Sequence, residues 1–311
     1  MAKRGRIFAV IFLALLIPVL LKAPESEAKV YRGKYANNTK WSYDTKTKTV
    51  IIECRGELPD DHHGSAGWRD YYLKAKKVIF KKGITSIGEG AFYNFQKLEE
   101  VVLPEGLKTI KDSAFFTCIR LKKINVPTSL RTIGASAFSE TEFNAFSLER
   151  VKKIGNMCFS GSKIKEVYLS KDCRTSSLVF WGSEDLKKVT IEKGVKKISY
   201  GMFCDTALKT IDIPGSVFQI GEDAFADCKK LQKVTLHEGI KKVGKNAFYN
   251  TSLKEITIPS TVTELGKNAF RWEAMEKSSL KKVVIRSKNI KKWGTMVFGA
   301  TRDDLVIYVP Q

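Results

Sequence analysis

The sequence is poor in the residue types that catalytic sites use most often. It has three histidines among 311 residues and no Gly-x-Ser-x-Gly motif. The repeat described below also singles out no pair of carboxylates. General acid–base and nucleophilic catalysis depend on such groups being held close together. The sequence therefore predicts a protein that is not an enzyme and that needs no cofactor.

The sequence also lacks an apolar run long enough for an ordinary membrane span. The longest run covers residues 7–21, whereas a spanning helix needs about 20 residues. It follows a basic start at residues 3–6 and precedes a small-x-small tripeptide at residues 26–28. This arrangement is typical of a signal peptide over residues 1–28, and it predicts a secreted or cell-surface protein with no membrane span after cleavage. An uncleaved anchor is the alternative, whereas a lipoprotein anchor is disfavoured because no cysteine directly follows the run.

Acidic residues are too few to balance the basic ones. There are 33 Asp and Glu against 54 Lys and Arg, which gives a formal net charge of +21 at pH 7. Removal of residues 1–28 would leave the chain strongly basic. A partner that carries anionic groups would therefore be attracted to this protein.

What the sequence does contain is a repeat of about 23 residues. Ten phenylalanines recur near this spacing: Phe92, Phe115, Phe138, Phe159, Phe180, Phe203, Phe225, Phe248, Phe270 and Phe298. The best copies read Ile-Gly-x-x-Ala-Phe, and Leu-x-x-Val-x-Leu-Pro or a close variant follows, as in residues 98–104. This alternation predicts a short strand with one buried face, ended by proline. A turn, a second extended piece at Ile-Gly and a bend or single helical turn at Ala-Phe complete each unit.

One such unit cannot bury its apolar face alone, so the units are expected to stack. The predicted fold is a repeat solenoid of short stacked β-strands, with about ten repeats over residues 78–311. Phe115, Phe138, Phe225 and Phe248 should then lie in one buried column. Residues 29–77 contain two strand-like runs around a Lys/Thr turn, and they are predicted to form an amino-terminal β-hairpin cap.

The two motifs together resemble the BspA-type leucine-rich repeats of bacterial surface proteins, and the resemblance covers about residues 41–310. It implies a leucine-rich-repeat solenoid and a role in adhesion or surface binding. The asparagine ladder of commoner leucine-rich repeats is missing, because proline occupies the turn. Cys158 and Val179 stand in the alanine column and Thr175 in the isoleucine column, so this middle region is expected to be a kink or a functional interruption.

Six cysteines in an exported protein usually suggest disulfides. Here, however, Cys118 and Cys228 share a position three residues after the repeat phenylalanine, where other repeats have threonine. This register favours small buried thiols that fill a column, although disulfides remain the alternative.

Two short segments resemble ligand sites but are better explained without a ligand. Residues 60–63 form an Asp-Asp-His-His cluster that could bind a metal, but adjacent histidines do not share a face of a regular element, which favours a solvated loop. Residues 239–246 nearly match a phosphate-binding loop but end in Asn where Ser or Thr is required. We therefore expect neither a metal nor a nucleotide.

The remaining signal is lysine placed by the repeat. Paired lysines lie directly before the Ile-Gly step or directly after the strand leucine, and they are the candidate ligand-binding residues: Lys122, Lys123, Lys152, Lys153, Lys187, Lys188, Lys196, Lys197, Lys241, Lys242, Lys281, Lys282, Lys291 and Lys292. Stacking would bring like charges about 5 Å apart, which is unfavourable unless solvent, salt or a polyanion screens them. Such columns could equally serve solubility alone.

Two hypotheses for the function follow. The first is a secreted or cell-surface, adhesin-like protein whose lysine-rich face binds an acidic protein, an anionic polysaccharide or a wall polymer, with no specific nucleic acid. The alternative is a structural cell-envelope repeat protein without a specific ligand.

Overall fold

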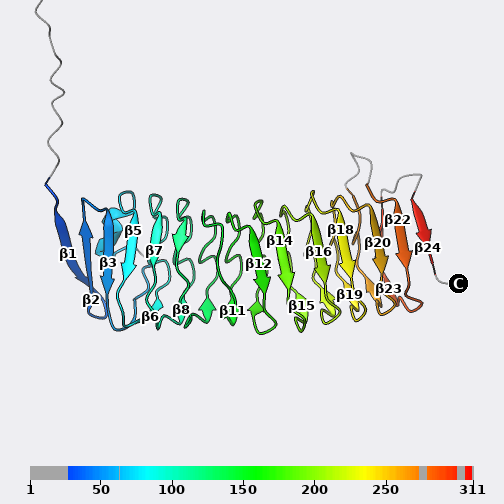
Figure 1. Cartoon of the computed structure of the whole chain (residues 1–311), viewed down its shortest axis with the longest axis horizontal. Helices are drawn as coiled ribbons and strands as arrows, with labels where there is room; N and C mark the ends of the chain where they lie inside the picture. Colours follow the sequence, from blue (N-terminus) through cyan, green and yellow to red (C-terminus); the bar gives the residue numbers. More distant parts are fainter. Residues whose placement is uncertain (1–26, 63, 273–278, 300–304, 310–311) are drawn as a thin grey trace, which may run out of the picture.

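A rod of stacked coils makes up the protein (Figure 1). The computed structural model describes residues 27–62, 64–272, 279–299 and 305–309. Within these ranges nearly all regular structure is β, and the one helix is the short 3-10 helix η1 (Gly67–Tyr71). This architecture confirms the predicted solenoid, whereas most of the predicted signal peptide lies outside the described residues.

The amino-terminal end is the only place where the described strands run antiparallel. β1 (Val30–Tyr35), β2 (Thr39–Asp44) and β3 (Thr49–Glu53) pair antiparallel in that order. β3 then pairs in parallel with β5 (Lys77–Phe80), which is the first strand of the repeats. Because the hairpin covers one end of the parallel stack, it shields the core there from solvent.

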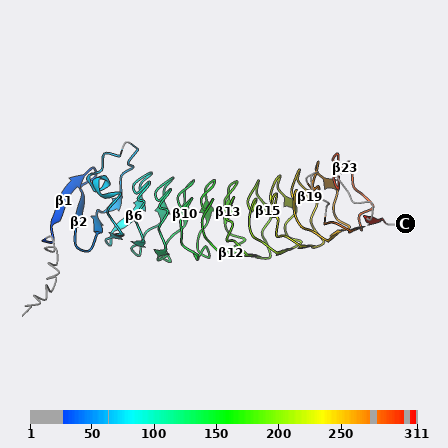
Figure 2. The same ribbon diagram turned by 90° about the horizontal axis from the view of Figure 1, so that it is seen from above.

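Most coils contribute one strand to each of two faces, and within each face neighbouring strands pair in parallel in several short ladders. The long-strand face consists of β5, β7 (Glu100–Val102), β9 (Lys123–Ile124), β12 (Glu166–Leu169), β14 (Lys188–Ile191), β16 (Thr210–Ile213), β18 (Lys233–Leu236), β20 (Glu255–Ile258), β22 (Lys282–Ile285) and β24 (Val306–Tyr308). The short-strand face consists of β4 (Gly56–Glu57), β6 (Ile84–Ile87), β8 (Thr109–Ile110), β10 (Thr132–Ile133), β11 (Lys153–Ile154), β13 (Arg174–Thr175), β15 (Lys197–Ile198), β17 (Gln219–Ile220), β19 (Lys242–Val243), β21 (Glu264–Leu265) and β23 (Lys292–Trp293). Figure 2 shows the same coils from above.

The alternating sequence of each long strand explains its position. In β16, Ile211 and Ile213 are buried whereas Thr210 and Asp212 are exposed. Pro214 follows directly and offers no backbone N–H, so the ladder ends there and the chain turns. The strand therefore has one face in the core and one in solvent, as the Val-x-Leu-Pro pattern predicts.

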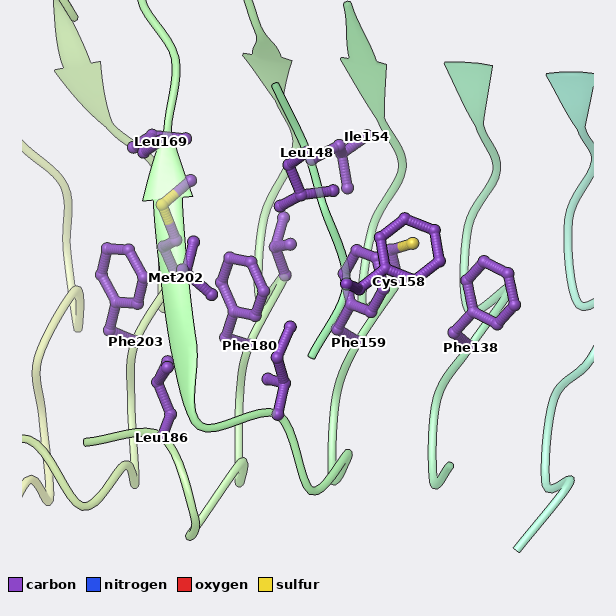
Figure 3. Close-up of a cluster of buried hydrophobic side chains, with 14 of the residues drawn as sticks. Phe138, Leu148, Ile154, Cys158, Phe159, Leu169, Phe180, Leu186, Met202 and Phe203 are labelled. Carbon is purple, nitrogen blue, oxygen red and sulfur yellow. The ribbon is translucent and has the colours of Figure 1, made fainter. Parts of the chain in front are cut away.

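A column of stacked rings forms the core between the two faces. Phe115 and Phe138 have ring centroids 5.4 Å apart and planes within 1° of parallel, and Phe225 and Phe248 lie 5.2 Å apart. All four are fully buried, which confirms the column predicted from their spacing. Figure 3 shows the middle of this column, where the rings of Phe203, Phe180, Phe159 and Phe138 lie side by side in a row.

A tryptophan closes the column at the amino-terminal end. Trp68 of η1 is fully buried, and its ring stacks on Phe92 with centroids 6.0 Å apart. Its indole N–H donates a hydrogen bond to the carbonyl oxygen of Ala91 at 2.9 Å. The helix therefore supplies the terminal member of the phenylalanine column.

Glycine after the isoleucine lets neighbouring coils approach closely. A Cβ on Gly244 would lie 2.6 Å from the backbone of Gly221 and Glu222 in the preceding coil. The Ile-Gly step is therefore a point of backbone contact between coils, which only glycine permits without displacement.

In the coils from Phe92 to Phe248, two positions adopt a left-handed backbone conformation, two residues before and two after the column phenylalanine. Around Phe248 they are Asn246, with φ 53°, and Asn250, with φ 56°. The side-chain N–H of Asn250 donates to Asp227 at 2.7 Å, and that of Asn246 donates to Asp223 at 2.9 Å. The chain thus has a short Asp/Asn ladder of its own, at a place that the sequence did not indicate.

The middle region interrupts the strand ladders but not the core. Between β9 and β12 the described chain forms no strand on the long-strand face, and Phe143 and Phe146 instead pack against Phe138, with centroids 5.5 and 5.2 Å away. The ring column continues through Phe159, 5.8 Å from Phe138. Where the sequence departs from the repeat pattern, the long-strand face therefore lacks a strand, but the stack of coils and its ring column continue.

All six cysteines are unpaired in the structure. The thiol of Cys118 donates to the carbonyl oxygen of Phe92 at 3.2 Å, and that of Cys228 donates to Phe203 at 3.0 Å. In another coil the hydroxyl of Thr141 donates to Phe138 at 2.8 Å. Cysteine and threonine thus share one register because either can satisfy a buried carbonyl beside the ring column.

Candidate binding surfaces

The predicted lysine columns lie along the solvent side of both faces. On the short-strand face, Lys197, Gln219, Lys242, Glu264 and Lys292 pair in register across consecutive coils. The register places uncharged or acidic residues between the lysines. In this part of the column the lysines are therefore separated by one coil and are not neighbours at about 5 Å.

Glu264 is the clearest case of compensation within a column. Its carboxylate lies 3.1 Å from the ammonium of Lys242 and 3.5 Å from that of Lys292. The hydrogen bond from Lys242 lowers the pKa of Glu264, so the carboxyl stays ionised at neutral pH. Two of the candidate lysines are thus already partnered within the protein.

Three further candidates also have carboxylate partners in a neighbouring coil. Lys188 lies 3.2 Å from Glu166 across β12 and β14. Lys152 lies 2.7 Å from Asp172, and Lys122 lies 3.2 Å from Glu142. Exposed pairs of this kind contribute little to stability, about 0–1 kcal/mol, but they reduce the charge offered to a ligand.

The remaining candidates form no ion pair within the ranges that the structure describes: Lys123, Lys153, Lys187, Lys196, Lys197, Lys241, Lys281, Lys282 and Lys291. One of them has another partner, since the ammonium of Lys282 lies 5.6 Å above the ring centroid of Tyr308. The structure therefore divides the candidates into a compensated group and a group whose charge faces solvent.

Three uncompensated lysines recur on every second coil of the short-strand face. Backbone hydrogen bonds of 2.9–3.0 Å link Lys196, Phe218, Lys241, Thr263 and Lys291 in sequence from coil to coil. We call these five residues the outer column. At about 4.8 Å per coil, its lysines are roughly 10 Å apart, with an uncharged residue between each two.

Phe218 adds an exposed apolar side chain to the outer column, a role that the sequence analysis did not assign to it. Its side chain is 44% exposed, although phenylalanine is otherwise the core residue of this fold. It lies between Lys196 and Lys241 in the backbone ladder. Its position outside the 23-residue phenylalanine register was the available signal.

A groove on the long-strand face lies over β18, β20 and β22. It has a volume of about 610 Å³, and Lys233, Lys282 and Arg286 line it together with acidic residues. Beside it His237 and Asp212 share a hydrogen bond of 2.7 Å. Since charges of both signs alternate here, this groove offers a less uniform field than the outer column.

The Asp-Asp-His-His segment serves the local fold. Asp61 is buried and accepts the backbone N–H groups of Ser65 and Ala66 at 2.8 and 3.2 Å. Asp60 accepts the N–H of Glu89 at 2.8 Å. In the described part of the chain no three His, Cys, Asp or Glu side chains gather as a metal site, and His63 lies outside the described residues.

The near match to a phosphate-binding loop also has a structural explanation. The backbone N–H of Gly239 donates to the hydroxyl of Thr261 in the next coil at 2.8 Å, and its φ is 116°. The glycine therefore serves the turn between the two faces, and its N–H already has a partner.

The geometry defines the class of the protein, a β-solenoid of about 23-residue repeats around a phenylalanine column. A family model for the BspA type leucine rich repeat region matches residues 70–178 and 176–276 in six copies. Because these matches span well over half of the sequence, the chain belongs to the BspA-type leucine-rich repeat family. No curated protein matches it.

Several solved structures of bacterial leucine-rich repeat proteins are similar to this chain. A leucine-rich repeat protein from Eubacterium ventriosum is 22% identical, with a TM-score of 0.63, over 90% of this chain and 78% of that one. One from Bacteroides ovatus is 18% identical over 93% and 100% of the two chains, with a TM-score of 0.46. A leucine rich cell surface protein from Faecalibacterium prausnitzii is 18% identical over 90% and 95%, with a TM-score of 0.39. At these identities the first likeness supports the fold alone.

The described ranges contain no helix that could cross a membrane. None of their helical segments is both long and apolar enough to span a bilayer. The apolar run at residues 7–21 lies outside those ranges.

Proposed function

We propose that this chain is a secreted or cell-surface, non-enzymatic repeat protein that binds an anionic polymer or an acidic protein along its short-strand face. The observation that carries the proposal is the outer column, with Lys196, Lys241 and Lys291 on alternate coils and Phe218 between the first two. Membership of the BspA-type family and the export signal expected at residues 1–28 support the surface location.

The spacing suits a polymer better than a small anion. Lysine carries a mobile point charge without the rigid fork that arginine uses for bidentate recognition. A row of charges roughly 10 Å apart can contact successive anionic groups along one chain. We infer many weak and exchangeable contacts, with affinity that falls as salt rises.

A second candidate function has its own support. Five of the fourteen candidate lysines are compensated by carboxylates of neighbouring coils. A surface that only keeps a structural envelope protein soluble would be built in this way. On this alternative, retention on an anionic column would depend on the total charge of the protein and not on the positions of individual lysines.

The two candidates separate in a matched comparison on a heparin column. The triple variant Lys196→Gln, Lys197→Gln and Lys241→Gln removes three uncompensated charges, and the control variant Lys122→Gln, Lys152→Gln and Lys188→Gln removes three compensated ones. We expect the first variant to elute at clearly lower salt than the control. Equal elution of both variants, or retention of the parent no greater than that of a neutral repeat protein of the same size, would favour the structural alternative.

A further inference from the structure

A second concave surface lies at the amino-terminal end, in coils other than those of the outer column. Figure 2 shows η1 beside the β1–β2 hairpin. The hairpin, η1 and the turns of the next coils line an open groove with a volume of about 680 Å³, which we call the cap groove. Small-molecule sites typically have volumes of about 300–1,000 Å³, so the groove has the size of a site for one or a few sugar-sized units.

The position of η1 against the hairpin is fixed by a tryptophan held between two glycines. A Cβ on Gly33 or on Gly67 would come within 2.6 Å of the indole ring of Trp41. Gly33 lies in β1 and Gly67 begins η1. Because the ring fills the space between the two backbones, the groove beside it is preformed.

Three tyrosines from different elements form the apolar part of the groove. The rings of Tyr43 and Tyr71 stack with centroids 4.0 Å apart, and that of Tyr31 lies 5.8 Å from Tyr71. Tyr43 is buried, whereas Tyr31 is 46% exposed. Burial raises the pKa of both Tyr43 and Tyr71, so their phenols stay protonated and can donate hydrogen bonds.

The rest of the lining is strongly cationic. Lys48, Lys74, Lys97 and Arg120 line the groove, and none of them has an ion-pair partner among the residues with described positions. Lys76 lies there too, but it is 2.8 Å from Glu99. Against these cations the lining contains one carboxylate, that of Asp70.

We propose that the cap groove binds one unit of an anionic saccharide, a sugar that carries a carboxylate or sulfate group. The C–H face of a sugar ring packs on the rings of Tyr31 and Tyr71, its hydroxyls meet the phenols, and its anionic group lies among the four uncompensated cations. Rigid tyrosines supply contact area with little loss of side-chain entropy. The proposal goes beyond the proposed function, because it concerns a separate surface and a single sugar unit.

The test is calorimetric titration of the full exported chain with sulfated N-acetylglucosamine, glucuronic acid, neutral N-acetylglucosamine and a short poly-glutamate peptide. We expect saturable binding of at least one anionic sugar and much weaker binding of the neutral sugar. The sulfated and carboxylated probes distinguish the source of the negative charge. No anionic binding well into the millimolar range, equal binding of the neutral sugar, or binding of the peptide at least as tight as that of the sugars would overturn the proposal.

Variants keep the test specific. Tyr31→Ala should weaken binding of the anionic sugar about three- to tenfold, the range expected for loss of one aromatic contact, and Lys74→Gln with Lys97→Gln should weaken it as well. The control Tyr168→Ala removes a tyrosine of β12 that is 43% exposed and should leave binding unchanged. An equal effect of Tyr31→Ala and Tyr168→Ala would contradict the site.

Binding of the single sugar should not depend on the lysines of the outer column. The triple variant at Lys196, Lys197 and Lys241 should keep its affinity for the single sugar even where it loses retention on heparin. Loss of both properties in that variant would place the sugar on the short-strand face and would refute the cap groove.

Discussion

The ring column makes a sharp prediction about stability, because one coil offers a buried and an exposed phenylalanine only seven residues apart. Phe225 is fully buried between Phe203, 5.4 Å away, and Phe248, 5.2 Å away. Truncation of a buried phenylalanine to alanine costs about 3–5 kcal/mol through lost transfer energy and the cavity that remains. The loss of two stacked neighbours places Phe225→Ala in the upper part of that range.

The control is Phe218→Ala, which removes the same side chain from a position that is 44% exposed. Surface substitutions of this kind usually change the free energy of unfolding by less than about 0.5 kcal/mol. Urea unfolding followed by circular dichroism measures both, and coincidence with fluorescence tests whether the solenoid unfolds in one step. Equal costs for the two variants, or a cost of Phe225→Ala below about 1 kcal/mol, would refute the repeat register.

Four further predictions concern the backbone and the thiols. Glu140 is exposed and has a left-handed backbone conformation with φ 58°. Since Asn tolerates this conformation better, Glu140→Asn should raise the free energy of unfolding, measured in urea, by up to about 1 kcal/mol. A decrease would contradict the idea that Glu140 is strained. Gly244→Ala should lower that free energy by about 1–3 kcal/mol, because the new Cβ would lie 2.6 Å from the preceding coil, and an unchanged midpoint would mean that the coils are farther apart. Alkylation under denaturing, non-reducing conditions should label most of the six cysteines, whereas three disulfides by mass spectrometry would overturn the packing account. Burial raises the pKa of Cys118 to about 12. In the unfolded chain this thiol loses its proton at lower pH than in the folded chain, so the free energy of unfolding should fall as pH rises above about 9. The fall should be less steep in the variant Cys118→Thr.

The fold was predictable because every coil repeats the same physical requirement. The phenylalanine spacing, the strand alternation and the terminal proline each follow from burial in a stack, so one sequence pattern fixes the register of all coils. Trp68 escaped the prediction although it precedes Phe92 by about one repeat, because the pattern was followed through phenylalanine alone. The left-handed positions escaped as well, since their residues range from Asn246 to Glu140 and share only their backbone conformation.

The binding surfaces were predictable only in part. The lysines lie in the expected columns, but their charge depends on residues about one repeat away, as Glu264 shows between Lys242 and Lys292. Alignment of the repeats identifies such neighbours, whereas inspection of each lysine pair alone does not. The cap groove follows no period, because β1, η1 and two later turns build it together, and no sequence spacing relates Tyr31 to Tyr71.

We expect the uncompensated lysines of the short-strand face to bind polyanions, and the salt dependence of the affinity decides whether they do. Affinity for a long linear polyanion, measured at several salt concentrations, should fall linearly on a double-logarithmic plot because bound counterions are released. Each lysine that contacts the polymer contributes about one to the slope. The triple variant at Lys196, Lys197 and Lys241 should therefore lower the slope by about two to three, and the compensated control at Lys122, Lys152 and Lys188 should lower it by less. A parent slope near zero, or the same slope in the triple variant and the parent, would contradict the claim.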